Sequence, residues 1–190
     1  VNRPAVLLLD EPLSALDQQL RQEMQVELKT IQERAGCTFV CVTHHQEEAL
    51  TMSDRVAVMQ QGRVLQIGSP QALYESPASA FVARFIGVSN ELHGIVRRIE
   101  GERAIVQSPE CVGEVQIVLP MPMAIQVGSQ VTLLIRPERL RLSTAAQGLS
   151  GEQSLAASVD KVLYSGSDRR YLVRLGEHAV WNVRVPNDES

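Results

Sequence analysis

The first third of the chain alternates between short apolar runs and helical periodicity. Residues 5–9 (Ala-Val-Leu-Leu-Leu) form a continuous apolar run closed by Asp-Glu-Pro, which predicts a strand covered on both faces in a parallel sheet. Residues 20–35 repeat apolar side chains every three or four positions before Gly36, which predicts an amphipathic helix of about five turns. Residues 37–43 are rich in β-branched side chains and predict the next buried strand. Together these segments predict a β-α-β unit with a right-handed crossover.

Shorter elements follow, up to about residue 87. We predict a short helix over residues 46–52 and a hairpin at the edge of the sheet, with strands at 55–60 and 63–67 around Gln61-Gly62. Two more short helices are predicted at 70–74 and 79–86, the first with a proline at its favoured early position.

Beyond Gly87 the pattern changes to short β-type runs separated by Gly, Pro, Ser and acidic turns. The runs are residues 94–99, 104–107, 114–119, 130–135, 157–163, 170–175 and 179–185. Their spacing predicts a small barrel or sandwich, interrupted by a long loop over residues 143–155. We therefore place a domain boundary after Gly87, with an α/β domain over residues 1–87 and an all-β domain over 88–190.

Composition limits the class of protein. The chain has 190 residues, of which 44% are hydrophobic and 21% charged, values typical of a globular protein. A net charge of -4 without a basic block argues against nucleic acid as a partner. We find no apolar stretch long enough to cross a bilayer and no signal peptide, so we expect a cytoplasmic chain. The spacing of Cys37, Cys41 and Cys111 has no metal-ligand pattern, and we interpret all three as reduced thiols.

Two adjacent carboxylates, Asp10 and Glu11, follow the first predicted strand. Charged groups at the end of a buried strand are unfavourable unless a positive partner compensates them. A metal-bound nucleotide would do so, because one carboxylate can hold Mg²⁺ through water while the other activates an attacking water. The alternative is that both residues begin a solvated turn and cap the helix that follows.

His44 follows the next predicted strand at its carboxyl end. Neighbouring parallel strands bring such ends together, at the edge of the sheet where ligands bind. His44 could therefore contact a γ-phosphate near Asp10 and Glu11. The alternative is a structural or surface histidine.

These pieces resemble the ATPases of ATP-binding cassette (ABC) transporters. Residues 7–17 (LLLDEPLSALD) are similar to the Walker B strand and D-loop, and residues 42–50 (VTHHQEEAL) to the switch-histidine segment. Residues 54–64 and 68–70 resemble the strand pair and helix start that come next. The resemblance implies a P-loop NTPase fold, here a parallel sheet with flanking helices, and ATP and Mg²⁺ as cofactors.

The same resemblance implies a role for each matching residue. Asp10 would hold Mg²⁺ through water, Glu11 would be the general base, and His44 would bridge the γ-phosphate. Ser14 and Asp17 would lie in the D-loop at the interface of an ATPase homodimer. The sequence departs from the family at His45, where an aspartate is usual.

Several family motifs do not occur in this sequence. There is no G-x-x-x-x-G-K-[ST] phosphate loop, no glutamine that we can place as the lid residue, and no L-S-G-G-Q-like signature. In the family these precede the Walker B strand, and the chain opens with Val1, so we expect further sequence upstream. We expect the 190-residue chain by itself neither to bind ATP tightly nor to hydrolyse it.

The second half resembles the TOBE domain, an OB-like barrel appended to importer ATPases of the polyamine, iron, sulfate and sugar classes. The resemblance rests on residues 85–90 (FIGVSN), 135–140 (IRPERL) and 164–167 (YSGS). Family members continue with further strands, so we expect this barrel to be incomplete at its C-terminus or closed by a partner chain.

Other residues could be assigned binding roles, but simpler interpretations exist. The aromatic residues Tyr164, Tyr171 and Trp181 could form a ligand platform, although packing within strands is the simpler interpretation. Arg136, Arg139 and Arg141 could bind an anion, or form a solvated, paired face of one strand. Met121 and Met123 are interpreted as loop packing.

We therefore interpret the chain as part of the ATP-hydrolysing subunit of a bacterial ABC importer, with the polyamine type favoured by residues 85–90. The implied partners are a second ATPase subunit, transmembrane permease subunits and, indirectly, a solute-binding protein, at the inner face of the membrane. The alternative is a catalytically inactive regulatory or assembly module. A DNA-repair ATPase is disfavoured, because the chain has neither long heptads nor a basic stripe.

Overall fold

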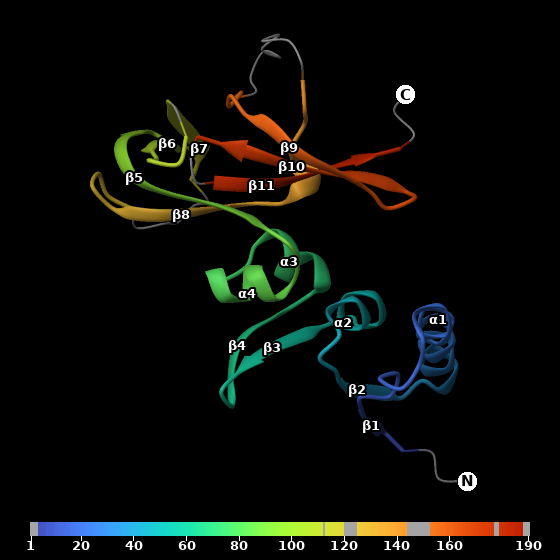
Figure 1. Cartoon of the computed structure of the whole chain (residues 1–190). Helices are drawn as coiled ribbons and strands as arrows, with labels where there is room; N and C mark the ends of the chain where they lie inside the picture. The colour runs from blue at the N-terminus through green and yellow to red at the C-terminus, as the bar shows by residue number, and fades with distance from the viewer. Residues whose placement is uncertain (1–3, 112, 120–124, 144–152, 177–178, 188–190) are drawn as a thin grey trace. The chain divides into compact units, whose positions relative to one another are not determined.

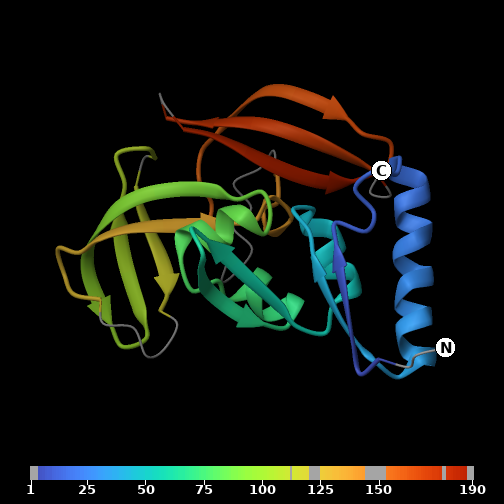
Figure 2. The same ribbon diagram turned by 90° about the horizontal axis from the view of Figure 1, so that it is seen from below.

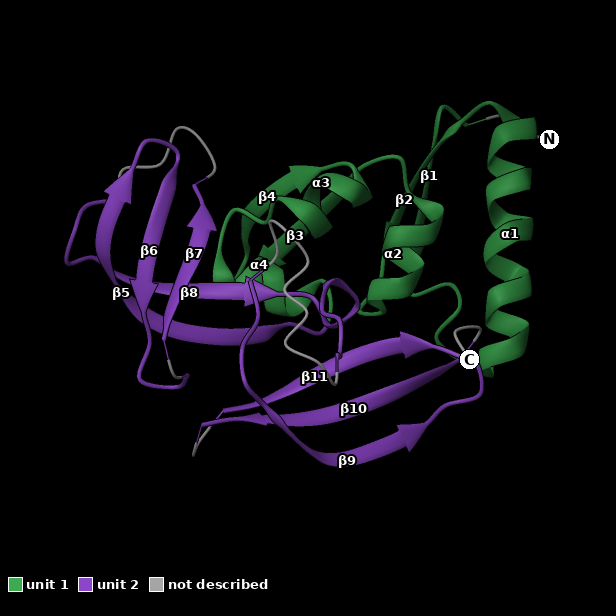
Figure 3. Cartoon of the chain, turned by 90° about the horizontal axis from the view of Figure 1, so that it is seen from above, with its two compact units in different colours: residues 1–87 green, residues 88–190 purple. Residues whose placement is uncertain are grey.

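The chain folds into two compact units, residues 1–87 and 88–190 (Figures 1 and 3). The structure is a computed structural model that describes residues 4–111, 113–119, 125–143, 153–176 and 179–187. Met121, Met123 and most of the predicted loop over residues 143–155 lie outside the described residues. Among the helices of the described part, none has the length and apolar composition needed to cross a bilayer.

The first unit begins with the predicted β-α-β arrangement. Strands β1 (Val6–Asp10) and β2 (Thr38–Val42) pair in parallel, with Leu8 opposite Val40, and α1 (Gln18–Ala35) connects them. Gly36 ends the helix in the left-handed conformation at φ 62°, as its position in the sequence predicts.

The prediction that β1 and β2 are covered on both faces is wrong for this chain. Helices α1 and α2 lie on one side of the two strands (Figures 1 and 2), and Phe39 and Cys41 are only partly exposed. The alternate side chains remain open, with Leu8 74% exposed. The reason is that, among the described residues, the sheet has only these two strands and no layer on its second face.

The rest of the first unit packs around a small core of its own. It contains α2 (Gln46–Met52), β3 (Val56–Gln60), β4 (Arg63–Gly68), α3 (Pro70–Glu75) and α4 (Ala80–Phe85). The buried side chains of this core are Val56, Val58, Leu73, Val82 and Ile86. Strands β3 and β4 form the predicted antiparallel hairpin, whose Gln61-Gly62 turn has two positive φ angles. In the described residues the hairpin is a separate sheet and not the edge of β1–β2, which corrects that detail of the prediction.

The described residues of the second unit form a β-rich fold with two sheets. One sheet has the order β7-β6-β5-β8 and curls into a half barrel (Figures 1 and 2); the other has the order β11-β10-β9. The strands are β5 (Asn90–Glu100), β6 (Arg103–Gln107), β7 (Glu114–Val118), β8 (Gln130–Ile135), β9 (Ser158–Tyr164), β10 (Asp168–Leu175) and β11 (Ala179–Pro186). Each predicted β-type run is found as one of these strands.

Buried side chains of both sheets meet in one hydrophobic cluster that includes Leu92, Val115, Val173 and Trp181. Polar side chains also join the sheets. The Asn90 amide donates to the carbonyl of Asn182 (2.7 Å) and accepts from its backbone N–H (2.6 Å). The Trp181 indole N–H donates to the carbonyl of Glu91 (3.1 Å), which confirms Trp181 as a packing residue.

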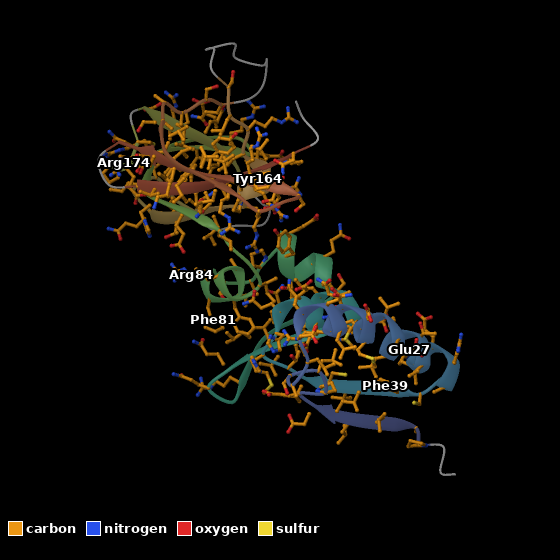
Figure 4. The ribbon with its side chains drawn as sticks, turned by 45° about the vertical axis from the view of Figure 1, so that its right-hand side comes forward. Glu27, Phe39, Phe81, Arg84, Tyr164 and Arg174 are labelled. Atoms are coloured by element: carbon orange, nitrogen blue, oxygen red, sulfur yellow. The ribbon has the colours of Figure 1, made fainter. Side chains whose placement is uncertain are left out.

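Two other sequence interpretations need correction. Tyr164 lies on β9 with 71% of its surface exposed (Figure 4), so it is not part of that core. Arg136, Arg139 and Arg141 are not on one face of a strand, because residues Pro137–Arg139 form a short 3₁₀ helix. Proline fixes φ near the helical value at the first position of that turn and ends β8 before it. Arg136 instead donates to the Ser89 hydroxyl (2.7 Å).

Candidate active site

The carboxyl ends of β1 and β2 bring Asp10, Glu11 and His44 to one edge of the parallel pair. Asp10 is the last residue of β1 and pairs with Val42, the last residue of β2. The His44 ring Nδ1 lies 2.8 Å from a carboxylate oxygen of Glu11. Both side chains are accessible, with exposed fractions of 62% for His44 and 46% for Glu11. The structure therefore brings together two residues that lie 33 positions apart in the sequence.

The backbone of Glu11 is in an uncommon conformation. Its φ is 44°, in the left-handed region that side chains other than glycine rarely adopt. Its N–H donates to the carbonyl of Val42 (2.8 Å), which continues the pairing of β1 and β2 by one residue. Its carbonyl accepts from the N–H (3.2 Å) and the hydroxyl (3.0 Å) of Ser14. Hydrogen bonds on both sides hold this residue where the chain turns away from the sheet.

The remaining predicted site residues have distinct local environments. Asp10 is exposed at the end of β1. Asp17 is the N-cap of α1, where its carboxylate accepts the N–H of Leu20 (3.0 Å). The alternative that Asp10 or Glu11 caps this helix is therefore wrong, since Asp17 does so.

Of the two adjacent histidines, His44 is the one whose ring lies beside Glu11. His45 is the N-cap residue of α2, and its backbone N–H donates to the hydroxyl of Thr43 (3.0 Å). The two imidazole rings lie against each other, with centroids 4.1 Å apart and planes tilted by 37°. His45 thus borders the site without contacting the Glu11 carboxylate.

A buried polar group behind His44 was not predicted from the sequence. Glu48 of α2 has a side chain only 4% exposed, and its carboxylate accepts the hydroxyl of Thr43 (2.6 Å). Arg21 of α1 lies 3.6 Å from the other carboxylate oxygen. The sequence shows Glu48 only as one of two adjacent glutamates, Glu47-Glu48, and helical spacing alone does not reveal which one is buried.

A shallow, open depression of about 350 Å³ adjoins these residues and is lined by Arg21, His44, His45, Gln46, Glu47 and Glu48. Burial, with a smaller contribution from the negative charge of Glu48, raises the pKa of the Cys41 thiol. The thiol therefore stays protonated at neutral pH, and we assign it no chemistry.

The arrangement can perform general base chemistry. An accessible carboxylate with a histidine in hydrogen-bond contact can accept a proton from water and orient the reacting group. Among the described residues, no group of three or more His, Cys, Asp or Glu side chains could hold a metal ion by itself. Asp10 provides one exposed carboxylate, which suits Mg²⁺, since this ion commonly binds one or two carboxylates plus phosphates and water.

Comparisons with known proteins find relatives over nearly the whole chain. Residues 133–190 match the model of the TOBE domain. The chain is 51% identical over 174 residues to the spermidine/putrescine import ATP-binding protein PotA of Rubrobacter xylanophilus, covering 92% of this chain and 45% of that protein. The comparisons confirm the resemblance to ABC importer ATPases. Proteins of the same name from Pseudomonas fluorescens (48% over 184 residues) and Trichodesmium erythraeum (45% over 192 residues) are similar over 97% and 100% of the chain.

The chain spans about half the length of these import ATP-binding relatives, since it covers 48% of the Pseudomonas fluorescens protein and 50% of the Trichodesmium erythraeum protein. The similarity includes both units, because it extends over nearly the whole chain.

Proposed function

We propose that this chain is part of the ATP-hydrolysing subunit of a bacterial ABC importer for polyamines of the spermidine and putrescine class. Residues 1–87 would be the rear part of a P-loop NTPase domain, and residues 88–190 an OB-type TOBE domain with a regulatory role. The similarity to spermidine/putrescine import ATP-binding proteins over at least 92% of the chain supports this assignment.

One observation carries the catalytic part of the proposal. The Glu11 carboxylate and the His44 ring are 2.8 Å apart at the carboxyl ends of two parallel strands, where nucleotides bind in open α/β sheets. Glu11 is also held at a positive φ, and strained backbone of this kind is concentrated at functional sites.

Each residue of the site has a proposed role. Glu11 accepts the proton of the attacking water, which can reach its carboxylate because that side chain is 46% exposed. His44 orients the terminal phosphate and is itself oriented through Nδ1 by Glu11. Asp10 holds Mg²⁺ through water, and when bound the ion neutralises negative charge on the phosphates.

Ser14 and Asp17 are proposed to lie at the interface with a second copy of the ATPase subunit. Both are exposed in the loop between β1 and α1, where hydrogen bonds within the chain fix their side chains. In the assembled importer, the ATPase dimer would contact permease subunits at the inner face of the membrane. A solute-binding protein would deliver the polyamine to those permease subunits.

The 190-residue chain by itself is proposed to be inactive. Its sequence has no phosphate loop and no signature motif, so it would supply only half of a nucleotide site. Addition of MgATP to the purified chain should give no phosphate release above background. Turnover that disappears in Glu11→Gln would contradict this statement.

The function is tested in the full-length protein with its permease, by measuring ATP hydrolysis and uptake of labelled spermidine. Glu11→Gln should lower kcat by roughly 10²–10⁴-fold, the usual contribution of a general base, and should stop uptake. Glu27→Gln is the matched control, because Glu27 lies exposed on α1 (Figure 4) and its loss should leave both rates unchanged. Unchanged hydrolysis in Glu11→Gln would overturn the assignment of the base.

The same experiment decides against the alternative of an inactive regulatory or assembly module. A wild-type full-length protein that neither hydrolyses ATP nor supports uptake, while still binding its permease, would establish that alternative. Uptake of another solute class in place of spermidine would retain the ATPase assignment and overturn the polyamine assignment.

A further inference from the structure

The buried Glu48 requires an explanation, because an ionised carboxylate inside a protein is costly unless it is paired and hydrogen-bonded. Its side chain is 4% exposed, yet it lies on the short helix that begins two residues after His44. The contacts of its two carboxylate oxygens indicate the structural role of Glu48.

One oxygen of Glu48 is bound by the turn that carries His44. The Thr43 hydroxyl donates to this oxygen (2.6 Å), and the same hydroxyl oxygen accepts the backbone N–H of His45 (3.0 Å). The Glu48 carboxylate thus holds the side chain of Thr43, the residue before His44. Through the Thr43 hydroxyl it also holds the backbone of His45, the residue after His44. The direction in which His44 leaves the backbone is set by this pair of bonds.

The other oxygen of Glu48 faces Arg21, which lies in the first turn of α1, directly after the loop that carries Glu11. Its terminal nitrogen donates to the carbonyl of Leu16 (2.8 Å), at the end of the segment between β1 and α1. The facing atoms, Arg21 Nε and Glu48 Oε1, are 3.6 Å apart, and each is buried without a hydrogen-bond partner in the structure. The two segments that supply Glu11 and His44 therefore meet at this ion pair.

We propose that Arg21, Thr43 and Glu48 are positioning residues that hold the His44 ring in hydrogen-bond contact with the Glu11 carboxylate. Their hydrogen bonds run to the backbone and to one another, and they act on His44 through the backbone on both sides of it. The catalytic value of the contact rests on the proposed function. The positioning itself can be measured in the 190-residue chain without nucleotide.

The test uses the whole chain with ¹⁵N-labelled histidine, at a pH where the His44 imidazole is neutral. The long-range ¹H–¹⁵N correlation of the ring reports the fraction of molecules with the proton on Nδ1, the tautomer that can donate to Glu11. Glu11→Gln gives the reference for a ring whose carboxylate partner has been removed. Backbone spectra of every variant report whether it is folded.

Thr43→Val removes the hydroxyl at nearly constant volume and should lower the Nδ1–H fraction of His44 to the value seen in Glu11→Gln. Thr43→Ser keeps the hydroxyl and should retain the wild-type fraction. Glu48→Ala should behave as Thr43→Val does, and Thr43→Val decides the result if Glu48→Ala does not fold. Thr30→Val is the matched control, because it removes a hydroxyl bond within α1 that is remote from the turn and should change nothing.

A wild-type Nδ1–H fraction in folded Thr43→Val, or an equal loss in Thr43→Ser, would overturn the proposal. These outcomes are independent of the proposed function, which fails separately if Glu11→Gln leaves ATP hydrolysis in the full-length protein intact. In that protein, Thr43→Val should lower kcat with an unchanged KM for ATP. A parallel rise in KM would indicate a general loss of structure and would also count against positioning.

Discussion

At the scale of single residues, a few polar side chains have environments that determine their chemistry. Glu11 combines an uncommon backbone angle with an accessible carboxylate, so this strained position is exposed to any ligand at the strand ends. Asp168 has the opposite environment. It is 6% exposed, and its oxygens accept hydrogen bonds from Ser165 (2.6 Å) and from Arg184 (2.8 Å). These bonds stabilise the ionised form of the carboxylate.

The environment of Asp168 predicts a pH dependence of stability. The Ser165 hydroxyl and then the Arg184 guanidinium lower the pKa of Asp168 below its ordinary value. The stabilisation is therefore complete above about pH 4, the pKa of an unfolded aspartate, and is lost as pH falls through the lower folded value. Asp168→Asn should be less stable than wild type at pH 7, and the difference should shrink below about pH 4.

Urea unfolding of both proteins from pH 7 to pH 2.5 measures this difference. Other carboxylates are common to the two proteins and cancel in the comparison. A difference that stays constant over the whole range would show that ionisation of Asp168 contributes nothing to folding. Ser167→Ala removes a weaker hydrogen bond (3.3 Å) to the same carboxylate and should give a smaller effect of the same sign.

At the scale of elements, the two units use their strands differently. Strands β1 and β2 have an open face, whereas β5, β10 and β11 contribute side chains to a common core. Contact between the two sheets of the second unit also depends on directed bonds. The Asn90 side chain on β5 forms hydrogen bonds with both the backbone N–H and the carbonyl of Asn182 on β11. Such directional bonds fix the position of one sheet along the other more precisely than apolar packing does.

Asn90→Ala should therefore destabilise the second unit by about 2–3 kcal/mol, because it leaves a partly buried N–H and a partly buried carbonyl of β11 without these partners. Asn182→Ala is the matched control, since the two bonds use the backbone of Asn182 and survive its truncation. Thermal unfolding of the three proteins gives the comparison. Equal losses in both variants would mean that the side-chain bonds of Asn90 do not hold the sheets together.

At the scale of the whole molecule, each unit has its own core, and the open sheet of the first unit is outside both. Amide hydrogen exchange should reflect this arrangement. We expect the amides of β1 and β2 to exchange faster than those of β10 by on the order of 100-fold or more, because local stability follows burial. The hairpin β3–β4 is the control, since it is also two-stranded but carries the buried Val58 and should be protected more than β1.

Exchange measured by mass spectrometry on the 190-residue chain tests this expectation. Equal protection of β1 and β10 would show that something in solution, such as a second copy of the chain, covers the open face. Dilution would then separate the two cases, because protection by a second copy falls with concentration.

The order and type of the elements could be predicted from local sequence signals, because hydrophobic period, glycines and caps act over a few neighbouring residues. The helix end at Gly36, the turn at Gln61-Gly62 and the strands of the second unit all follow from such local signals. The meeting of Asp10, Glu11 and His44 at one edge was also predictable, because the carboxyl ends of two paired parallel strands lie side by side.

Which faces are covered and which polar groups are buried became clear from the three-dimensional packing alone. The apolar run of β1 gives the same signal whether or not a second layer covers it, so the exposure of Leu8 was not predictable. Burial of Glu48 depends on Thr43 and on Arg21, which lies on another helix 27 residues earlier in the chain. Such contacts join residues far apart in sequence, and no local periodicity encodes them.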